Sequence, residues 1–261
     1  MCKVISLTNS KGGVGKTCLA VNLGVGFARA GKRVLIIDAD SQGSATISLG
    51  FSEPDRMEVS LATVLGKIIN DEEIDPTEGI LIHSEGVHIL PGNIELAGIE
   101  VSLVNIMSRE LILRQYIQLV KPYYDVILID CMPSLGMITI NALACSDACI
   151  IPVQSAYLPV RGLEQLMKTI SKVKKQINPG LIIEGIAITM VDYRTNYAKE
   201  ITELLTETYG NNIRIFEHKI PMSVRVAESS VAGCSIYQYD PRGKATAAFE
   251  GLTREVLYGA S

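Results

Sequence analysis

The chain has 261 residues, 48% of them hydrophobic and 5% aromatic, with 20% charged residues and a net charge of −4. The length suits one large α/β domain or two small ones, and the composition excludes a disordered or collagen-like chain. The acidic balance gives no overall field that attracts nucleic acid, so DNA binding would require a local basic patch. We expect a cytoplasmic protein, because no apolar run reaches the roughly 18 residues of a membrane span and the first residues lack a signal-peptide pattern.

Short β-branched runs alternate with longer segments of helical periodicity. The expected strands are 3–8, 33–38, 87–90, 125–130, 148–153, 182–189 and 213–220. The expected helices lie near 17–30, 59–69, 94–121, 136–145, 160–177, 195–209, 222–230 and 242–258. This alternation predicts an α/β fold with a single, doubly wound, mostly parallel sheet and helices on both faces. We expect one domain over 1–261, with the polar segment at about 51–85 as a surface excursion between the second and third core strands.

Residues 10–17, with the sequence SKGGVGKT, follow the first expected strand and open the first expected helix. A phosphate-binding loop requires this context. Glycines allow backbone N–H groups to approach phosphate oxygens, and the helix N-terminus adds its dipole. Lys16 can place its charge between the β- and γ-phosphates, and the Thr17 hydroxyl can ligate Mg²⁺. The sequence therefore predicts a P-loop ATPase that binds ATP and Mg²⁺. The predicted contacts in the loop are Lys11, Gly12, Gly13, Val14, Gly15, Lys16 and Thr17.

The loop departs from the ordinary pattern at its entrance. Ser10 stands where the first glycine is usual, and Lys11 follows it. From this position Lys11 is badly placed for its own phosphates but well placed to reach those of a neighbouring subunit. This predicts a dimer with ATP at the interface, in which Lys11 acts as an arginine finger does. The alternative is a solvated lysine.

Acidic residues follow two of the expected strands. The apolar run 34–37 ends in Asp38 and Asp40, and the run 126–129 ends in Asp130. These positions lie at the carboxyl edge of a parallel sheet, where ligands bind in open α/β folds. We predict that Asp130 holds the metal through water, that Asp38 lies on the metal side, and that Asp40 orients the attacking water. Each acid alone could instead be a strand-end or helix-cap residue.

The motifs resemble those of the ParA/Soj chromosome- and plasmid-partitioning ATPases, within the wider group that includes MinD. KGGVGKT and DADSQGSAT are similar to the deviant Walker A and A′ motifs of that family, and DVILIDCMPSLGMITINAL is similar to its Walker B strand and following helix. TMVDYRTN, IPMSVRVAE and YDPRGKATAAFEGLTREV resemble its C-terminal third. The resemblance extends over nearly the whole chain.

The resemblance implies a weak ATPase that dimerises on ATP, binds DNA without sequence preference and associates with the nucleoid. It also implies stimulation by a ParB-type partner bound to DNA. By the same resemblance, Lys11 is the signature lysine and Asp40 the hydrolytic acid, while Lys16 and Thr17 bind phosphate and Mg²⁺. Met190 and Pro221 match positions that flank the adenine.

The resemblance also points to DNA contacts. Arg194 and Arg225 match arginines that contact DNA in such dimers. The expected helix near 160–177 adds Lys168, Lys172 and Lys175 on one face, which is either part of a DNA surface or an ordinary solvated face.

Four features depart from the family pattern. Cys18 replaces a usual Ser or Thr near the α-phosphate, Ser41 replaces a Pro, and Met132 replaces the first Pro of DCPPS. The stretch 154–162 differs from the usual acidic and aromatic version. These departures concern nucleotide affinity and switching more than the fold.

Two other functional classes are weighed against partitioning. A MinD-like membrane-positioning ATPase needs a basic amphipathic C-terminal helix, whereas 249–261 carries two acids and one Arg, so we expect a core-docked helix and no membrane binding. An iron–sulfur ATPase needs paired thiolates at a dimer axis. Cys145 and Cys149 are spaced for this, but we expect the six cysteines to be reduced thiols, mostly buried.

Overall fold

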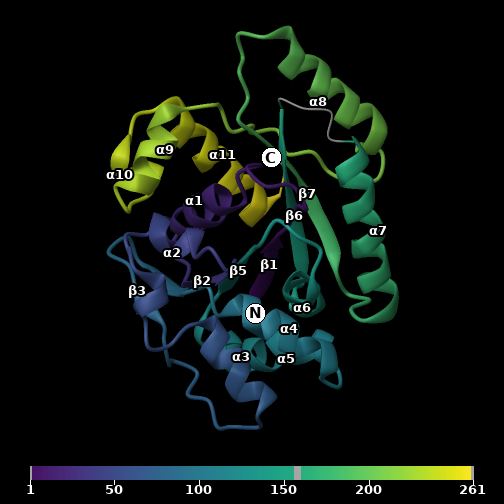
Figure 1. The fold of residues 1–261 in the computed structure, drawn as a ribbon. Helices are drawn as coiled ribbons and strands as arrows, with labels where there is room; N and C mark the ends of the chain where they lie inside the picture. The colour runs from purple at the N-terminus through teal and green to yellow at the C-terminus, as the bar shows by residue number, and fades with distance from the viewer. Residues whose placement is uncertain (1, 156–159, 260–261) are drawn as a thin grey trace.

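The computed structural model describes residues 2–155 and 160–259. Within them, seven strands form one sheet in the order β3-β4-β2-β5-β1-β6-β7 (Figure 1). All neighbouring strands are parallel except the β3–β4 pair. The strands are β1 (Lys3–Leu7), β2 (Val34–Ala39), β3 (Leu81–Ile82), β4 (Val87–Leu90), β5 (Val126–Cys131), β6 (Ala148–Gln154) and β7 (Ile182–Thr189). The predicted doubly wound, mostly parallel α/β fold is confirmed.

Helices lie on both faces of the sheet (Figure 1). They are α1 (Lys16–Arg29), α2 (Ser44–Ser48), α3 (Leu61–Ile69), α4 (Leu96–Ser102), α5 (Ile112–Val120), α6 (Met137–Cys145), α7 (Val160–Gln176), α8 (Asn196–Tyr209), α9 (Val224–Val231), α10 (Ile236–Tyr239) and α11 (Lys244–Tyr258). Four short 3-10 helices accompany them: η1 (Pro54–Arg56), η2 (Leu103–Asn105), η3 (Arg109–Leu111) and η4 (Lys121–Tyr123).

The strand side chains divide between two cores because successive residues of a strand point to opposite faces. On β2, Val34 and Ile36 pack with α1 and α11, whereas Leu35 and Ile37 pack with α3 and α5. All six residues of β2 and of β5 are buried, as expected for parallel strands covered on both faces. A third cluster joins β6 and β7 to α7 and α8.

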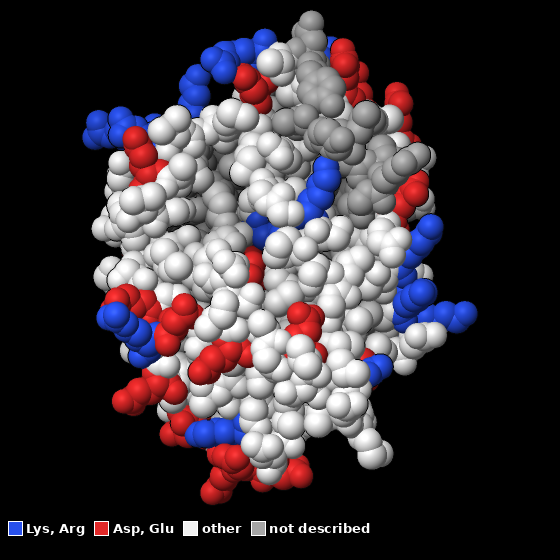
Figure 2. All heavy atoms as spheres, in the orientation of Figure 1, with Lys and Arg blue, Asp and Glu red and all other residues white. Residues whose placement is uncertain are grey.

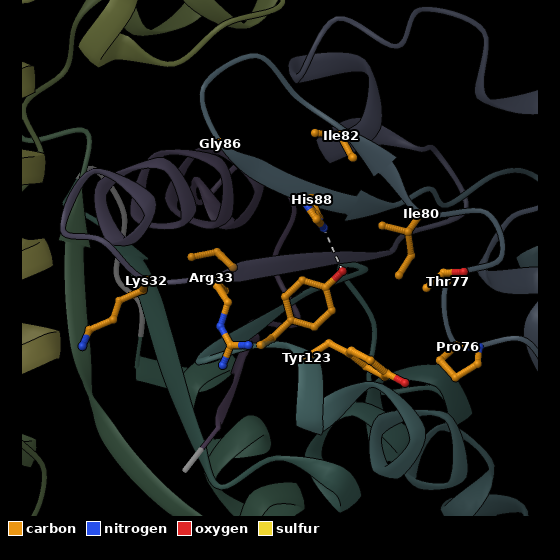
Figure 3. A pocket seen from close by; sticks show the side chains of 11 residues that line it. Lys32, Arg33, Pro76, Thr77, Ile80, Ile82, Gly86, His88 and Tyr123 are labelled. Atoms are coloured by element: carbon orange, nitrogen blue, oxygen red, sulfur yellow. Dashed lines mark hydrogen bonds between the residues drawn. The ribbon is translucent and has the colours of Figure 1, made fainter.

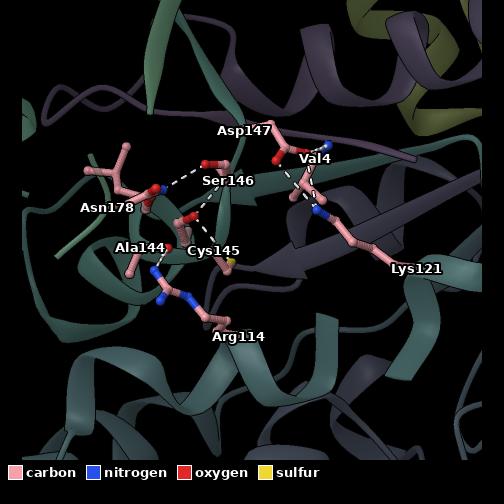
Figure 4. A network of polar contacts seen from close by, with 10 residues as sticks. Val4, Arg114, Lys121, Ala144, Cys145, Ser146, Asp147 and Asn178 are labelled. Carbon is pink, nitrogen blue, oxygen red and sulfur yellow. Dashed lines mark hydrogen bonds and ion pairs between the residues drawn. The ribbon is translucent and has the colours of Figure 1, made fainter. Parts of the chain in front are cut away.

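A polar network fixes the helices at the amino edge of β1 and β6 (Figure 4). Arg114 of α5 donates hydrogen bonds to the carbonyl oxygens of Ala144, at the end of α6, and of Ile177. A cation at the C-terminus of a helix also interacts favourably with the helix dipole. Asp147 accepts from the Val4 backbone N–H at 2.8 Å and from Lys121, so α5, α6 and the central strands are held together.

The segment 213–220 does not form the predicted strand. Its contacts with β7 include an isolated bridge between Ile186 and Ile215, and Ile220 donates to the Ile188 oxygen. The ladder is interrupted because the N–H groups of Glu217 and His218 donate to the buried Glu255 carboxylate, at 3.0 and 2.8 Å. A side chain therefore satisfies backbone groups that a neighbouring strand would otherwise pair.

The predicted single helix at 94–121 is also wrong, because α4, η2, η3 and α5 divide it. Ile106 is extended and Ser108 has a φ of 53°, which ends helical geometry between η2 and η3. Asn141 of α6 replaces the lost helical partners, since its side chain accepts from the Leu113 N–H and donates to the Arg109 oxygen.

Part of the expected surface excursion at 51–85 belongs to the core. Leu61, Val64 and Leu65 of α3 are buried against the sheet. At the other end of the chain, α11 buries Phe249 and Leu252 in the core, so its apolar side faces the protein. In the part of the chain that the structure describes, no helix is both long enough and apolar enough to cross a membrane.

The cysteines are free within the described residues. Cys145 packs in the core beneath α3 and α5, whereas Cys149 packs in the cluster of β6 and β7. The two thiols therefore do not form a common outward-facing pair. The departure expected at 154–162 includes residues 156–159, which lie outside the described residues.

Candidate functional site

The glycine-rich loop connects β1 to α1 at the carboxyl edge of the sheet. Gly13 and Gly15 have φ values of 71° and 84°, a backbone conformation that residues with a Cβ rarely adopt. Lys16 opens α1 and is 6% exposed, and its ammonium group donates to the Lys11 carbonyl oxygen at 2.9 Å. Burial lowers the pKa of Lys16, and the negative charges around it, Asp130 first, oppose that shift. The loop thus combines inward-turned backbone with a buried lysine at its centre.

Two side chains that sequence reasoning missed hold this loop in place. Asn9 donates to the Pro152 oxygen at 2.7 Å and accepts from the Lys11 N–H at 3.0 Å. Thr189, the last residue of β7, donates its hydroxyl to the Val14 oxygen at 2.8 Å. Thr189 is a polar residue at the end of a buried strand, and Asn9 lies two residues beyond one, which is the signal that would have found them. The loop is therefore fixed from both β6 and β7.

Three carboxylates meet beside the loop. Asp38 and Asp130 are register partners on the adjacent strands β2 and β5, and Asp40 follows two residues after Asp38. Burial is the main reason that the pKa of Asp38 rises to about 6, although it accepts two hydrogen bonds from Thr46, at 2.8 and 2.7 Å. Asp40 is 9% exposed and accepts from the Gln42 N–H at 3.0 Å.

Asp130 differs from Asp38 in its hydrogen bonding. Both of its oxygens are buried and accept no hydrogen bond of normal geometry from the described residues. Burial raises the pKa of Asp130 well above its usual value, and the neighbouring Asp38 raises it further. Thr17 and Lys16 lie near enough to oppose that rise in pKa. A buried carboxyl group that accepts no hydrogen bond of normal geometry can still accept bonds from a ligand beside the phosphate loop.

Gly92 is a further residue of the site that sequence reasoning missed. A Cβ at this position would lie 2.4 Å from the Asp38 carbonyl oxygen and 2.8 Å from that of Asp40. The Gly92 N–H also donates to the Thr46 hydroxyl at 3.3 Å. A glycine is needed here because the chain after β4 passes directly against the backbone that carries both acids.

The predicted adenine-flanking residues also come together. Val191 forms a bridge with Pro221, so Met190 and Pro221 lie on neighbouring segments beyond the end of β7. Met190 has a φ of 53°, and its carbonyl oxygen accepts from the Ser155 hydroxyl at 3.1 Å. Lys11 is exposed at the entrance of the loop, and Cys18 is partly buried in the first turn of α1. The structure thus brings the sequence-predicted nucleotide residues to one edge of the sheet.

Comparison with known proteins now identifies the family. Residues 2–183 match the family described as AAA domain. The chain is 41% identical over 256 residues to the sporulation initiation inhibitor protein Soj of Bacillus subtilis, covering 98% of each. It is 38% identical to the chromosome partitioning protein ParA of Myxococcus xanthus, covering 98% of this chain and 88% of that protein. The chain belongs to the ParA/Soj family of P-loop ATPases.

Solved structures share the fold of this chain. A cobyrinic acid a,c-diamide synthase from Mycobacterium smegmatis, with bound ADP and magnesium, superposes with a TM-score of 0.85 at 31% identity, covering 100% of this chain and 97% of that one. The septum site-determining protein MinD of Pyrococcus horikoshii, complexed with Mg-ADP, has a TM-score of 0.75 at 24% identity, covering 99% and 97%. The second likeness concerns the fold alone.

Arg194 and Arg225 are the two residues that were expected to contact DNA in this member of the ParA/Soj family. Both are exposed, and each forms an ion pair with a nearby acidic side chain. Arg194 donates to both oxygens of Asp192 at 2.8 Å, and these bonds lower the pKa of Asp192 to about 2. Arg225 pairs with Glu228 at 3.3 Å. In Figure 2, both basic and acidic side chains occur along the upper rim, and a basic and an acidic group are visible in a central hollow.

The lysines considered for DNA lie on the outer side of α7. Lys168, Lys172 and Lys175 are exposed, whereas Leu166 and Ile170 are buried on the opposite side of the helix. This is the arrangement that the helical spacing predicted. It places three positive charges on one surface.

A separate pocket of about 380 Å³ lies at the opposite, amino edge of the sheet (Figure 3). Its walls include Ile80, Ile82 and Tyr123, and inside it Tyr124 and His88 share a hydrogen bond of 2.9 Å. The pocket contains none of the loop or strand-end residues described above. The pocket and the glycine-rich loop therefore lie at opposite edges of the sheet.

Proposed function

We propose that this chain is an ATP- and Mg²⁺-dependent DNA-partitioning ATPase. Its ATP-bound homodimer binds DNA without sequence preference on the nucleoid, and hydrolysis stimulated by a DNA-bound ParB-like protein releases it. The names of the relatives support this proposal, including a chromosome-partitioning ATPase Soj from Treponema pallidum that is 37% identical over 98% of both chains. The ADP, ATP analogue and magnesium in the Mycobacterium smegmatis structures support the choice of cofactors.

The observation that carries the proposal is the buried Lys16 inside a glycine loop. Its ammonium group already donates to a carbonyl oxygen of the same loop, at Lys11, so an anion can replace an existing partner without unfolding anything. The backbone N–H groups of the loop and the start of α1 add donors and a favourable dipole for phosphate. We assign phosphate binding to residues 11–17, with Cys18 beside them in the first turn of α1 and the adenine between Met190 and Pro221.

The carboxylates fit a magnesium ion. Asp130 has two buried oxygens without donors, and the Thr17 hydroxyl lies nearby, so hard oxygen ligands converge beside the phosphates. Asp38 lies across from Asp130, and Thr46 fixes its orientation. When bound, Mg²⁺ would supply charge neutralisation for the phosphate oxygens.

We assign two roles to residues at the mouth of the site. Asp40 is the most exposed of the three carboxylates, so it is placed to orient a water molecule that attacks the terminal phosphate. Lys11 is exposed at the entrance, so its ammonium group can reach the nucleotide of a second subunit. Hydrolysis would be slow in the monomer because that second cation is missing there.

Co-sedimentation tests the proposal. The protein is mixed with ATP or ADP and pelleted with random-sequence DNA or with anionic liposomes at two salt concentrations. We expect pelleting with DNA in ATP alone, decreasing steeply with salt because phosphate contacts release counterions. Pelleting with liposomes alone would support a membrane-positioning ATPase instead, and pelleting with neither would refute DNA binding.

A pair of variants separates specific contacts from general charge. Arg194→Ala should weaken DNA pelleting, whereas Arg56→Ala should not. Arg56 is a matched control because it is 78% exposed and pairs with Glu53, much as the 87% exposed Arg194 pairs with Asp192. Equal effects of the two substitutions would remove Arg194 from the DNA surface.

A further inference from the structure

The pocket of about 380 Å³ at the amino edge of the sheet is separate from the proposed nucleotide site, and we call it the amino-edge pocket. Three segments form its wall: the turn between α1 and β2, residues 76–88, and η4 with the residue that follows it (Figure 3). Small-molecule sites usually have volumes of about 300–1,000 Å³. The amino-edge pocket is therefore large enough for a compound of about two linked aromatic rings.

Most of the wall is apolar or aromatic. Ile82 of β3 is 71% exposed and Tyr123 of η4 is 54% exposed, and both line the pocket. Exposed apolar side chains that gather around a hollow mark ligand sites, whereas isolated ones carry no such meaning. His88 and Tyr124 bring the number of rings in the wall to three. Rings attract one another beyond the area they bury, and a rigid ring loses less conformational freedom on binding than a flexible chain, so this wall favours an aromatic ligand.

The buried polar groups of the pocket are paired with each other. Tyr124 is 7% exposed, and its hydroxyl shares a hydrogen bond of 2.9 Å with His88 Nδ1. The two rings meet edge to face, with centroids 5.5 Å apart. Burial raises the pKa of Tyr124, so its hydroxyl stays neutral. Because this hydroxyl already has a partner, the inner wall favours an apolar group over a polar one.

The charged side chains of the wall are both cations. Lys32 and Arg33 lie on one side of the pocket in the view of Figure 3, and none of the described residues that line it is an acid. The acids that adjoin wall residues in the sequence all accept hydrogen bonds from protein groups: Asp75 from Thr77, Glu78 from Lys67, Glu85 from Ser235 and Asp125 from Arg33. The charge that the wall offers to a ligand is therefore positive.

Lys32 carries that charge. Arg33 is neutralised by Asp125, to which its side chain donates at 2.9 and 3.2 Å. These bonds are the main reason that the pKa of Asp125 is lowered, and the charge of Lys32 contributes less. Within residues 2–155 and 160–259, Lys32 forms no ion pair. Its ammonium group is a compact charge on a flexible stem, so it can turn toward an anionic group at the mouth of the pocket.

We propose that the amino-edge pocket binds a small aromatic anion. The ring system lies among Ile80, Ile82 and Tyr123, and its carboxylate or sulfonate pairs with Lys32. A neutral ring gains the apolar contacts alone and a cation is repelled at the mouth, so charge selects the anion. The inference does not rest on the proposed function, because these residues are not part of the nucleotide site.

Fluorescence titration of the nucleotide-free full chain with two probes tests the proposal. The anionic probe is 1-anilinonaphthalene-8-sulfonate, and the neutral probe is N-phenyl-1-naphthylamine, the same ring system without the sulfonate. Lys32→Gln should weaken binding of the anionic probe about threefold to fivefold, the effect of losing a partly exposed ion pair, and leave binding of the neutral probe unchanged. Ile82→Ser should weaken binding of both probes. Unchanged affinity of Lys32→Gln for the anionic probe would overturn the proposal.

Matched variants and competitors locate the bound probe. Lys174→Gln changes an exposed lysine of α7, and Ile94→Ser changes another exposed isoleucine, so neither should alter binding. Displacement of the anionic probe should be stronger with 2-naphthoate than with decanoate, a flexible anion of similar size, and equal displacement would contradict an aromatic site. Displacement by Mg-ADP would place the probe at the carboxyl edge instead, and the proposal would be wrong.

Discussion

Replacing Asp38 with Asn should stabilise the nucleotide-free protein, and increasingly so as the pH rises. Asp38 is fully buried, and its pKa in the folded protein is about 6 against a usual value of 3.8. At pH values between these two pKa values, this carboxyl is therefore protonated in the folded protein but ionised in the unfolded chain. Its contribution to stability falls as the pH rises through that interval.

The size of the effect follows from the two pKa values. A pKa difference of about 2.2 corresponds to about 3 kcal/mol at about 1.4 kcal/mol for each pKa unit. Roughly half of this develops between about pH 5 and about pH 7.5, so the stability advantage of Asp38→Asn should grow by roughly 1–2 kcal/mol over that range. The change also lowers the pKa of Asp130, because one of the two adjacent negative charges is removed, and this acts in the same direction.

Urea unfolding in the presence of EDTA measures this difference at each pH. The single carboxamide oxygen of the variant can keep the bonds from Thr46, so the hydrogen bond that the Asp40 N–H donates to the other Asp38 oxygen, at 3.3 Å, is lost. This loss shifts all values equally and leaves their pH dependence unchanged. Asp71→Asn, at an exposed position, is the control and should give a constant difference. A constant difference for Asp38→Asn as well would refute the argument that burial makes this carboxylate costly.

Four further substitutions test other parts of the site and the fold. Lys11→Ala should bind ATP normally but not dimerise, and an ATP-induced dimer by light scattering would reject a role across the interface. Asp40→Ala should bind ATP and dimerise without turnover, so phosphate release at the wild-type rate would remove it from the mechanism. Thr189→Val leaves the buried Val14 oxygen without its donor, which should weaken ATP binding by about 1–3 kcal/mol in calorimetry, and unchanged affinity would argue against anchoring from β7. Glu255→Gln should destabilise the fold by about 2–4 kcal/mol in urea unfolding, because the buried carboxylate accepts hydrogen bonds from Arg214 and from the backbone N–H groups of Glu217 and His218. Glu250→Gln, at an exposed position on the same helix, is the control and should change stability little.

Local sequence determined the fold class and the position of the phosphate loop. Alternating runs predicted strands β1, β2, β4, β5, β6 and β7 within a residue or two, because parallel strands buried on both faces are continuously apolar. The glycines of 10–17 also predicted a tight loop at this position. The positive φ values of Gly13 and Gly15 are ones that residues with a Cβ rarely adopt. Asp38 and Asp130 were expected to meet because strand ends in a parallel sheet share one edge, and they are register partners.

Tertiary structure decided the features that depend on hydrogen bonds between residues far apart in the sequence. The segment 213–220 has strand-like composition, but Glu255 from α11 takes its N–H groups, and no local pattern reveals a carboxylate about 40 residues away. The same reason explains the junction of η3 and α5, where Asn141 replaces helical partners, and the anchoring of the loop by Thr189. Burial and hydrogen bonding, and hence the separate characters of Asp38 and Asp130, arise only when the strands and helices pack together. Sequence therefore set the chemistry available at the edge of the sheet, and packing set the charge state and orientation of each group there.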